Sequence, residues 1–101
     1  MTETKTLTWA IDLDGTLTKS IWFPGLPEPE PYLDRIAKIN DMYNNCQVIF
    51  IHTARKEENR PETEMWLAKH KVRYTALVMN KLAITGKYVD DRAINSEDFF
   101  K

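Results

Sequence analysis

Two aspartates in the string Asp12-Leu13-Asp14-Gly15-Thr16 have the types and spacing best suited to chemistry. They follow a run that is expected to form a buried strand, so both carboxylates would lie at the end of that strand. Two like charges only a few ångströms apart repel each other unless a cation lies between them. A divalent ion that prefers oxygen ligands, such as Mg²⁺, would remove this conflict, while Gly15 permits a sharp turn that Thr16 can brace. The string therefore favours a metal-dependent reaction over a surface turn.

Other chemically capable side chains also follow expected strands. Four strand ends carry such groups: Asp12 and Asp14, then Thr53, then Lys81, and last Asp90 with Asp91. In open parallel sheets, ligands bind outside the carboxyl ends of the strands. Acids, a hydroxyl and an amine at one sheet edge are typical of phosphoryl transfer, in which a carboxylate attacks phosphorus while the other groups hold its remaining oxygens.

The elements that must position these groups alternate between strand and helix. Their periodicity and boundary residues predict strands over residues 6–11, 47–51, 76–79 and 87–89, and helices over residues 32–44 and 61–71. Residues 48–51 are all apolar, which is typical of a strand covered on both faces. The alternation predicts a parallel sheet with right-handed crossovers. We therefore expect a small three-layer α/β fold with a single domain over residues 1–101.

Residues 18–31 contain four of the five prolines of the chain and cannot form a helix or a central strand. They are expected to form an extended, turn-rich loop beside the end of the first strand. The apolar residues Ile21, Trp22 and Phe23 near its start leave two interpretations open. They either fold over the site as a flap or anchor the loop in the core.

Composition excludes several classes of protein. The chain has 101 residues, of which 43% are hydrophobic and 29% charged, as is ordinary for a soluble globular domain. Its 14 basic and 15 acidic residues give a net charge of −1, whereas a nucleic-acid-binding domain is usually distinctly basic. The single Cys46 excludes an internal disulfide and suits a reducing compartment. With no apolar run of membrane-spanning length and no signal peptide, a cytoplasmic location is expected.

The string at residues 12–16 resembles the first motif of the haloacid dehalogenase superfamily of phosphotransferases. This resemblance implies an aspartyl-phosphate mechanism in which Asp12 is the nucleophile and Asp14 is the general acid and then the general base. It also implies that Gly15 and Thr16 lie against the bound substrate. The implied fold is a Rossmann-like core.

Thr53, in the string Ile51-His52-Thr53-Ala54-Arg55, resembles the second motif, whose hydroxyl binds the phosphate. The Thr-Ala-Arg string is similar to small phosphatases of the capsule-biosynthesis type and to the phosphatase domain of phage polynucleotide kinase. The similarity implies that Thr53 and Ala54 bind substrate. Arg55 either contacts substrate as well or is a solvated loop residue.

The third motif requires a lysine, and both Lys81 and Lys87 have the right type. In the related small phosphatases this lysine stands about nine residues ahead of the acidic pair, which favours Lys81 as a catalytic and substrate-binding residue. Those relatives usually have Gly-Lys-Pro, whereas this chain has Asn80-Lys81-Leu82.

The string Tyr88-Val89-Asp90-Asp91 resembles the fourth motif. By that resemblance Asp90 completes a Mg²⁺ site begun by Asp12 and Asp14, and Asp91 supports the site or coordinates the ion through water.

Superfamily members that act on small metabolites usually carry a cap domain, for which residues 19–30 and 79–81 leave no room. We therefore expect an open site and a bulky phosphorylated substrate, such as a sugar or polysaccharide precursor, unless another subunit of a homo-oligomer covers it. The expected function is a Mg²⁺-dependent phosphatase.

Two alternatives remain. One is a polynucleotide 3′- or 5′-phosphatase, which a basic stripe near the site would favour: Lys19, Arg55, Lys56 and Arg60. The other is a catalytically silent module that holds a phosphorylated partner. Retention of both Asp12 and Asp14 argues against that second alternative.

Overall fold

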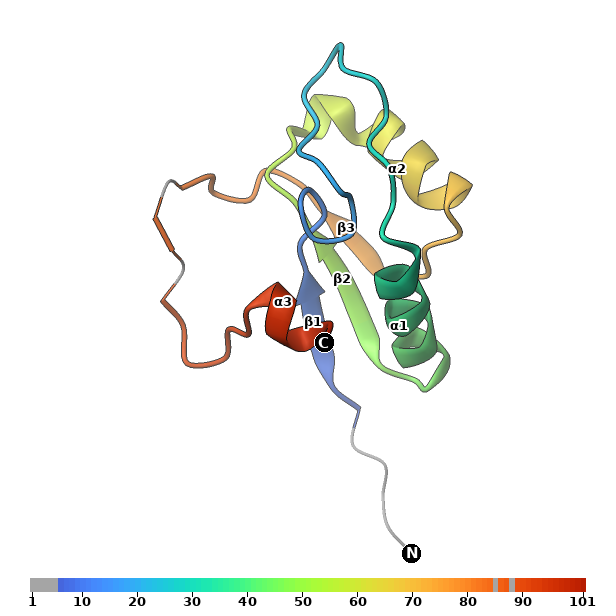
Figure 1. Cartoon of the computed structure of the whole chain (residues 1–101), viewed down its shortest axis with the longest axis vertical. Helices are drawn as coiled ribbons and strands as arrows, with labels where there is room; N and C mark the ends of the chain where they lie inside the picture. The colour runs from blue at the N-terminus through green and yellow to red at the C-terminus, as the bar shows by residue number, and fades with distance from the viewer. Residues whose placement is uncertain (1–5, 85, 88) are drawn as a thin grey trace, which may run out of the picture.

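A computed structural model describes residues 6–84, 86–87 and 89–101. Its elements are, in chain order, β1 (Thr8–Ile11), α1 (Leu33–Asn44), β2 (Val48–His52), a 3₁₀ turn (Glu57–Asn59), α2 (Arg60–Lys69), β3 (Ala76–Val78) and α3 (Ser96–Phe99) (Figure 1). The strands form a parallel sheet in the order β1-β2-β3, with Ile11 opposite Ile51 and Ile51 opposite Leu77. The predicted small α/β fold with a parallel sheet is thus confirmed.

The hydrophobic core lies between the sheet and helices α1 and α2. Alternate strand residues point to one face of a sheet, and here Ile11, Ile51 and Leu77 are the buried ones. They pack with Ile39 of α1 and Trp66 of α2 in one cluster of buried side chains. The connection from β1 to β2 through α1 and the connection from β2 to β3 through α2 both move in the same direction across the sheet. Because such connections share one handedness, α1 and α2 lie on the same face of the sheet.

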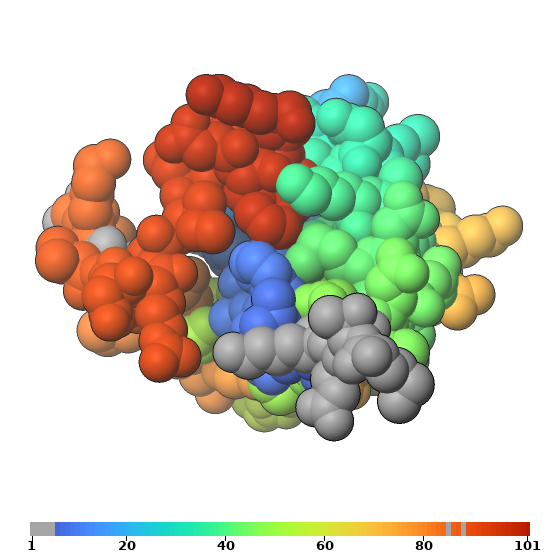
Figure 2. Space-filling view, turned by 90° about the horizontal axis from the view of Figure 1, so that it is seen from below, coloured from blue at the N-terminus to red at the C-terminus, as the bar shows by residue number. Residues whose placement is uncertain are grey.

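The opposite face of the sheet is half exposed in the part of the chain that the structure describes. Burial alternates along β2, where Ile49 and Ile51 are buried while Val48, Phe50 and His52 are only half-buried. In Figure 2, α1 and α3 gather on one side of β1. The predicted third layer is therefore not confirmed. The apolar residues of β2 point alternately to a buried face of the sheet and to a face that is partly open.

Of the predicted fourth strand over residues 87–89, Lys87 and Val89 are not part of the described sheet, and Tyr88 lies outside the described residues. Val89 is 99% exposed. The chain then turns back on itself, since the Asp90 side chain accepts the backbone N–H of Arg92 at 2.9 Å and its carbonyl accepts that of Ala93 at 3.3 Å. This local turn, with no buried side chain among the described neighbours, explains why Lys87 and Val89 do not join the sheet.

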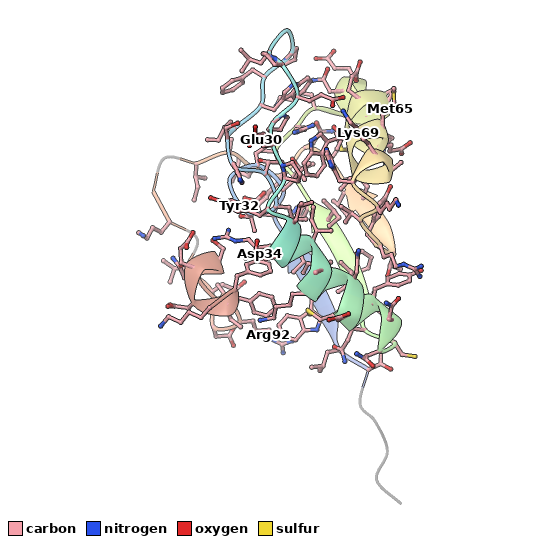
Figure 3. All side chains as sticks on the ribbon, turned by 45° about the vertical axis from the view of Figure 1, so that its right-hand side comes forward. Glu30, Tyr32, Asp34, Met65, Lys69 and Arg92 are labelled. Carbon is pink, nitrogen blue, oxygen red and sulfur yellow. The ribbon has the colours of Figure 1, made fainter. Side chains whose placement is uncertain are left out.

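The bounds of the two long helices follow the prediction closely. In α2 the buried residues are Thr63, Trp66 and Leu67, whereas Met65 is 67% exposed on the outer side of the helix (Figure 3). Residues 63, 66 and 67 share one face of the helix because of its 3.6-residue period, and Met65 lies on a different face. None of the helices within the described ranges is long and apolar enough to cross a membrane.

The C-terminal residues dock on the body of the protein. The ring of Phe99 in α3 lies 5.4 Å from that of Trp9 in β1, centroid to centroid, and Glu97 pairs with Arg35 of α1 at 3.0 Å. The short helix itself was not predicted. It begins at Asn95, whose side chain accepts the backbone N–H of Glu97.

The proline-rich loop is fixed at its base, although residues 19–30 contain no helix or strand. Its two ends meet where the Lys19 N–H donates to the Glu30 carbonyl at 2.8 Å. The buried indole of Trp66 donates to the Pro29 carbonyl at 2.9 Å. These contacts anchor the loop to α2 and leave its tip free to border the carboxyl ends of the strands.

Candidate active site

A cavity of about 540 Å³ opens at the carboxyl ends of the three strands. Its polar wall is formed by residues that come from separate strand ends: Asp12, Asp14, Thr53, Arg55 and Lys81. Its apolar wall comes from residues 21–24 of the proline-rich loop and from residues 82–84 after β3. The predicted convergence of acids, hydroxyl and amine at one sheet edge is thus observed for the first three strands.

Asp12 follows β1 directly, and its carboxylate is held by the chain that turns after it. The backbone N–H of Leu13 donates to Asp12 Oδ1 at 2.8 Å. Burial raises the pKa of the Asp12 carboxyl above its usual range, and this effect outweighs the opposing influence of the Lys81 ammonium and of the Leu13 N–H. A fixed and partly desolvated carboxylate that faces an ammonium is well arranged to act as a nucleophile toward an anionic centre.

Gly15 makes the turn that brings Asp14 back toward the cavity. It has a φ of 79°, in the left-handed region that glycine adopts most readily, and its N–H donates to Thr18 Oγ1 at 3.0 Å. Gly15 and Thr16 do not line the cavity, whereas Ala54 does. The carbonyl of Thr16 instead accepts a hydrogen bond from Arg35 at 2.9 Å. Gly15 and Thr16 thus shape the turn that follows Asp14 and do not contact the cavity.

Asp14 forms a bidentate ion pair with Arg55. The distances are 2.9 Å from Arg55 Nε to Asp14 Oδ2 and 2.7 Å from Arg55 Nη2 to Asp14 Oδ1. The Arg55 side chain is 4% exposed and that of Asp14 is 16% exposed, so water screens the pair little. Both carboxylate oxygens of Asp14 therefore accept guanidinium N–H groups, which is the strong, two-point form of carboxylate–arginine pairing.

Arg55 is fixed on its other sides as well, so its interpretation as a solvated loop residue is wrong. Its Nη1 donates to Thr63 Oγ1 at 3.2 Å, and its guanidinium carbon lies 4.5 Å from the centroid of the Trp22 ring. The Thr63 hydroxyl donates in turn to the Asn59 carbonyl at 2.8 Å. Sequence reasoning missed the pairing with Asp14, because no local pattern links residues 41 positions apart.

Thr53 and Lys81 are brought together by backbone hydrogen bonds across the ends of β2 and β3. The Thr53 N–H donates to the Val78 carbonyl at 2.9 Å, and the Lys81 N–H donates to the Thr53 carbonyl at 2.8 Å. The fully buried Thr53 hydroxyl accepts the Arg55 N–H at 3.2 Å. Lys81 lines the cavity and Lys87 does not, which agrees with the choice of Lys81 for the third motif.

His52, the last residue of β2, is half-buried beside the same groups. Burial and the nearby Lys81 ammonium lower the pKa of this histidine, with Asp12 acting in the opposite direction. The surroundings of this imidazole therefore favour its neutral form.

Asp90 and Asp91 do not line the cavity. Asp90 is fully exposed in the turn after residue 89, where the N–H of Arg92 and a hydrogen bond with Asp91 lower the pKa of its carboxyl. The segment that carries both acids lies to one side of the sheet (Figure 1). Within the described ranges, no three side chains of His, Cys, Asp or Glu come together as metal ligands.

Comparisons with known proteins support the fold. No protein-family model matches the chain, and no curated protein matches it. Among solved structures, the chain is similar to the crystal structure of a structural-genomics target from Vibrio cholerae, with 27% sequence identity and a TM-score of 0.77. The similarity covers 94% of this chain and 88% of the other. The two proteins therefore share an α/β fold over nearly their whole lengths.

Proposed function

We propose that the protein is a phosphomonoester hydrolase of the small, capless haloacid dehalogenase type, with Mg²⁺ as its cofactor and a bulky phosphorylated substrate. One observation supports this proposal most directly. A partly desolvated carboxylate, Asp12, shares a cavity with the Lys81 ammonium and with Thr53, at the edge of a parallel sheet where ligands bind. An acid facing cationic and hydroxyl groups fits attack on a phosphate better than attack on a neutral substrate.

In the proposed reaction the Asp12 carboxylate attacks phosphorus and forms an acyl phosphate, while the bond from phosphorus to the ester oxygen breaks. Protonated Asp14 gives its proton to the departing alkoxide, so an alcohol leaves. Water then attacks phosphorus, and Asp14 takes a proton from it. The acyl–oxygen bond to phosphorus breaks, which releases inorganic phosphate and restores the Asp12 carboxylate.

The other polar residues hold the phosphate during this sequence. Lys81 supplies a positive charge to the phosphoryl oxygens, whose negative charge is redistributed in the transition state. The Thr53 hydroxyl accepts the Arg55 N–H and retains its own proton for donation to the phosphate. Both residues are fixed by backbone hydrogen bonds between β2 and the chain after β3, so they are preorganised.

The proposed acid–base role of Asp14 requires the pair with Arg55 to open. An incoming dianionic phosphate competes with Asp14 for the guanidinium, because Arg binds phosphate in the same bidentate manner as it binds carboxylate. Transfer of Arg55 to the substrate would leave Asp14 free to accept a proton. Substrate binding and activation of the acid would then be one event.

The described arrangement does not itself form a Mg²⁺ site. Arg55 occupies both oxygens of Asp14, and Asp90 and Asp91 lie outside the cavity. A metal ion would require Asp14 to be released and further oxygen ligands to approach. The metal part of the proposal therefore rests on the sequence resemblance, and the steps above use only side chains of this chain.

The polynucleotide alternative loses support because the expected basic stripe is largely neutralised. Arg55 pairs with Asp14, Arg60 with Glu57 and Glu64, and Lys19 with Glu30. These carboxylates lie among the charges that were expected to track a phosphate backbone. The fourth stripe residue, Lys56, lines the cavity.

Release of phosphate from 4-nitrophenyl phosphate tests the proposed function. Wild-type protein with Mg²⁺ should turn this ester over, excess chelator should stop turnover, and Asp12→Asn should abolish it. Asp41→Asn, which makes the same chemical change on the exposed side of α1, is the matched control. Equal activity in Asp12→Asn and wild type would exclude the covalent mechanism, and full activity in chelator would exclude the metal.

A further inference from the structure

Exposed apolar side chains border the cavity from two directions. One wall is the segment of residues 21–24 and the other is residues 82–84. Ile21 is 61% exposed, Phe23 63% and Leu82 74%. Scattered exposed apolar residues need no explanation, but a group of them around a cavity with a charged floor marks a binding surface.

The first wall is held in place before any ligand arrives. The Trp22 ring packs over the Arg55 guanidinium, and its Nε1 donates to the Leu26 carbonyl at 3.2 Å. The Leu26 N–H donates back to the Phe23 carbonyl at 3.0 Å, which closes a tight turn at the tip of the loop. Because this turn fixes the backbone on both sides of Phe23, a ligand that contacts its ring does not have to order the loop.

The second wall begins at the residue proposed to hold the phosphate. Asn80 has a φ of 63°, and its N–H donates to the Arg55 carbonyl at 2.8 Å, so the chain is fixed immediately before Lys81. Residues 82–84 then continue along the cavity. A phosphate bound by Lys81 would therefore lie next to apolar surface, and the group that follows it in the ligand would contact that surface.

The chemistry of the two walls selects what can follow the phosphate. A polyol placed there would lose hydrogen bonds to water without gaining partners from Phe23 or Ile84. A flat aromatic ring would instead bury apolar area at little cost in conformational freedom. The cavity volume of about 540 Å³ exceeds what a phosphate needs and is within the usual range for small-ligand sites.

We propose that this cavity takes phosphomonoesters that carry an aromatic ring, with the phosphate on the polar floor and the ring between the walls of residues 21–24 and 82–84. This inference rests on the proposed function and narrows its substrate. The ring could belong to an aryl group or to a nucleobase, and the substrates of the test distinguish these two sources.

The test compares esters of primary alcohols that differ in the ring alone. Adenosine 5′-monophosphate is set against ribose 5-phosphate, and 2-phenylethyl phosphate against ethyl phosphate. The expected kcat/KM is at least about tenfold higher for a ring-bearing ester than for its partner, as is typical of one well-buried apolar group. If the enzyme prefers the ring-bearing ester only in the first pair, the site is specific for a nucleobase. If it also prefers the ring-bearing ester in the second pair, the site accepts simple aryl groups as well. Equal or better turnover of both ring-free esters would overturn the inference and leave the hydrolase proposal standing.

Variants of the walls show whether they cause the preference. Phe23→Ala and Ile84→Ala should each reduce the ratio of kcat/KM between the ring-bearing and ring-free ester several-fold. Met65→Ala, at an exposed apolar residue on the outer side of α2, should leave the ratio unchanged. An unchanged ratio in both wall variants would contradict the inference.

Binding separates this inference from the proposed function. If the wild-type protein hydrolyses no ester, the hydrolase proposal fails, and calorimetric titration of Asp12→Asn with the same pairs then decides about the ring. Tighter binding of adenosine 5′-monophosphate than of ribose 5-phosphate would support the aromatic site, and equal binding would overturn it.

Discussion

Asp14 and Arg55, which lie 41 positions apart in the chain, form a bidentate ion pair at the carboxyl ends of β1 and β2. Arg55 is enclosed by this carboxylate, the Thr63 hydroxyl and the Trp22 ring. The pair therefore ties the first strand end to the second strand end, to α2 and to the proline-rich loop. Asp14, which is proposed to carry a proton in the reaction, has both of its oxygens engaged by Arg55 in this pair.

Removing one partner of this pair should cost stability. Arg55→Ala leaves the Asp14 carboxylate without its counter-charge in a poorly hydrated position, and loss of one partner of a buried pair costs on the order of 3 kcal/mol. Urea unfolding of wild type, Arg55→Ala, Asp14→Ala and the double variant would measure the coupling. The double variant should lose less than the sum of the single losses. Strict additivity would show that the two side chains stabilise the fold independently.

Lys81→Ala should reduce kcat by roughly 10²-fold or more, since a charge that stabilises the transition state is lost. Lys87→Ala removes the same charge from an exposed residue that does not line the cavity, so it should have little effect. Steady-state kinetics with 4-nitrophenyl phosphate would make the comparison. A larger loss in Lys87→Ala would mean that the third motif has been assigned to the wrong lysine.

Asp12→Asn should stabilise the fold at neutral pH while it removes activity. Burial raises the folded-state pKa of Asp12 above its unfolded value, so the fold favours the neutral carboxyl. The stability that this carboxyl contributes is full below the unfolded pKa and is lost as pH rises through the folded pKa. Asn resembles the neutral form, so the variant should melt higher than wild type at pH 7, in chelator.

The same argument fixes the pH dependence. The difference in Tm between Asp12→Asn and wild type should shrink as the pH falls below the usual carboxyl range, where wild-type Asp12 is protonated in both states. Asp41→Asn, at an exposed position, should show no such trend. A variant that melts lower than wild type at neutral pH would show that the carboxylate is stabilised by its surroundings, contrary to the argument from burial.

The sequence predicted the parts of the fold that depend on local patterns. Apolar periodicity placed α1 and α2 within two residues of their observed bounds, and the apolar run at 48–51 identified the central strand. The cluster of Asp12, Asp14, Thr53 and Lys81 followed from their positions after strands, because the strand ends of a parallel sheet share one edge.

The sequence alone does not predict contacts that depend on how segments distant in the chain pack together. The Asp14–Arg55 pair and the stacking of Trp22 on Arg55 depend on how the loop of residues 18–31 lies against the strand ends. The residue pattern also wrongly favoured a strand over residues 87–89. The β-favouring residue types there lie beside a turn that Asp90 stabilises with its own side chain. Local preference there is outweighed by local hydrogen bonding.

The central claim, that Asp12 accepts a phosphoryl group, can be measured without knowing the substrate. Beryllium trifluoride binds to the carboxylate of phosphate-accepting aspartates as a mimic of the acyl phosphate, and ¹⁹F NMR detects the bound form. In the presence of Mg²⁺, wild-type protein should show a protein-bound ¹⁹F resonance that is absent from Asp12→Asn and retained in Asp41→Asn. A bound resonance of equal intensity in Asp12→Asn, or none in the wild-type protein, would contradict the account.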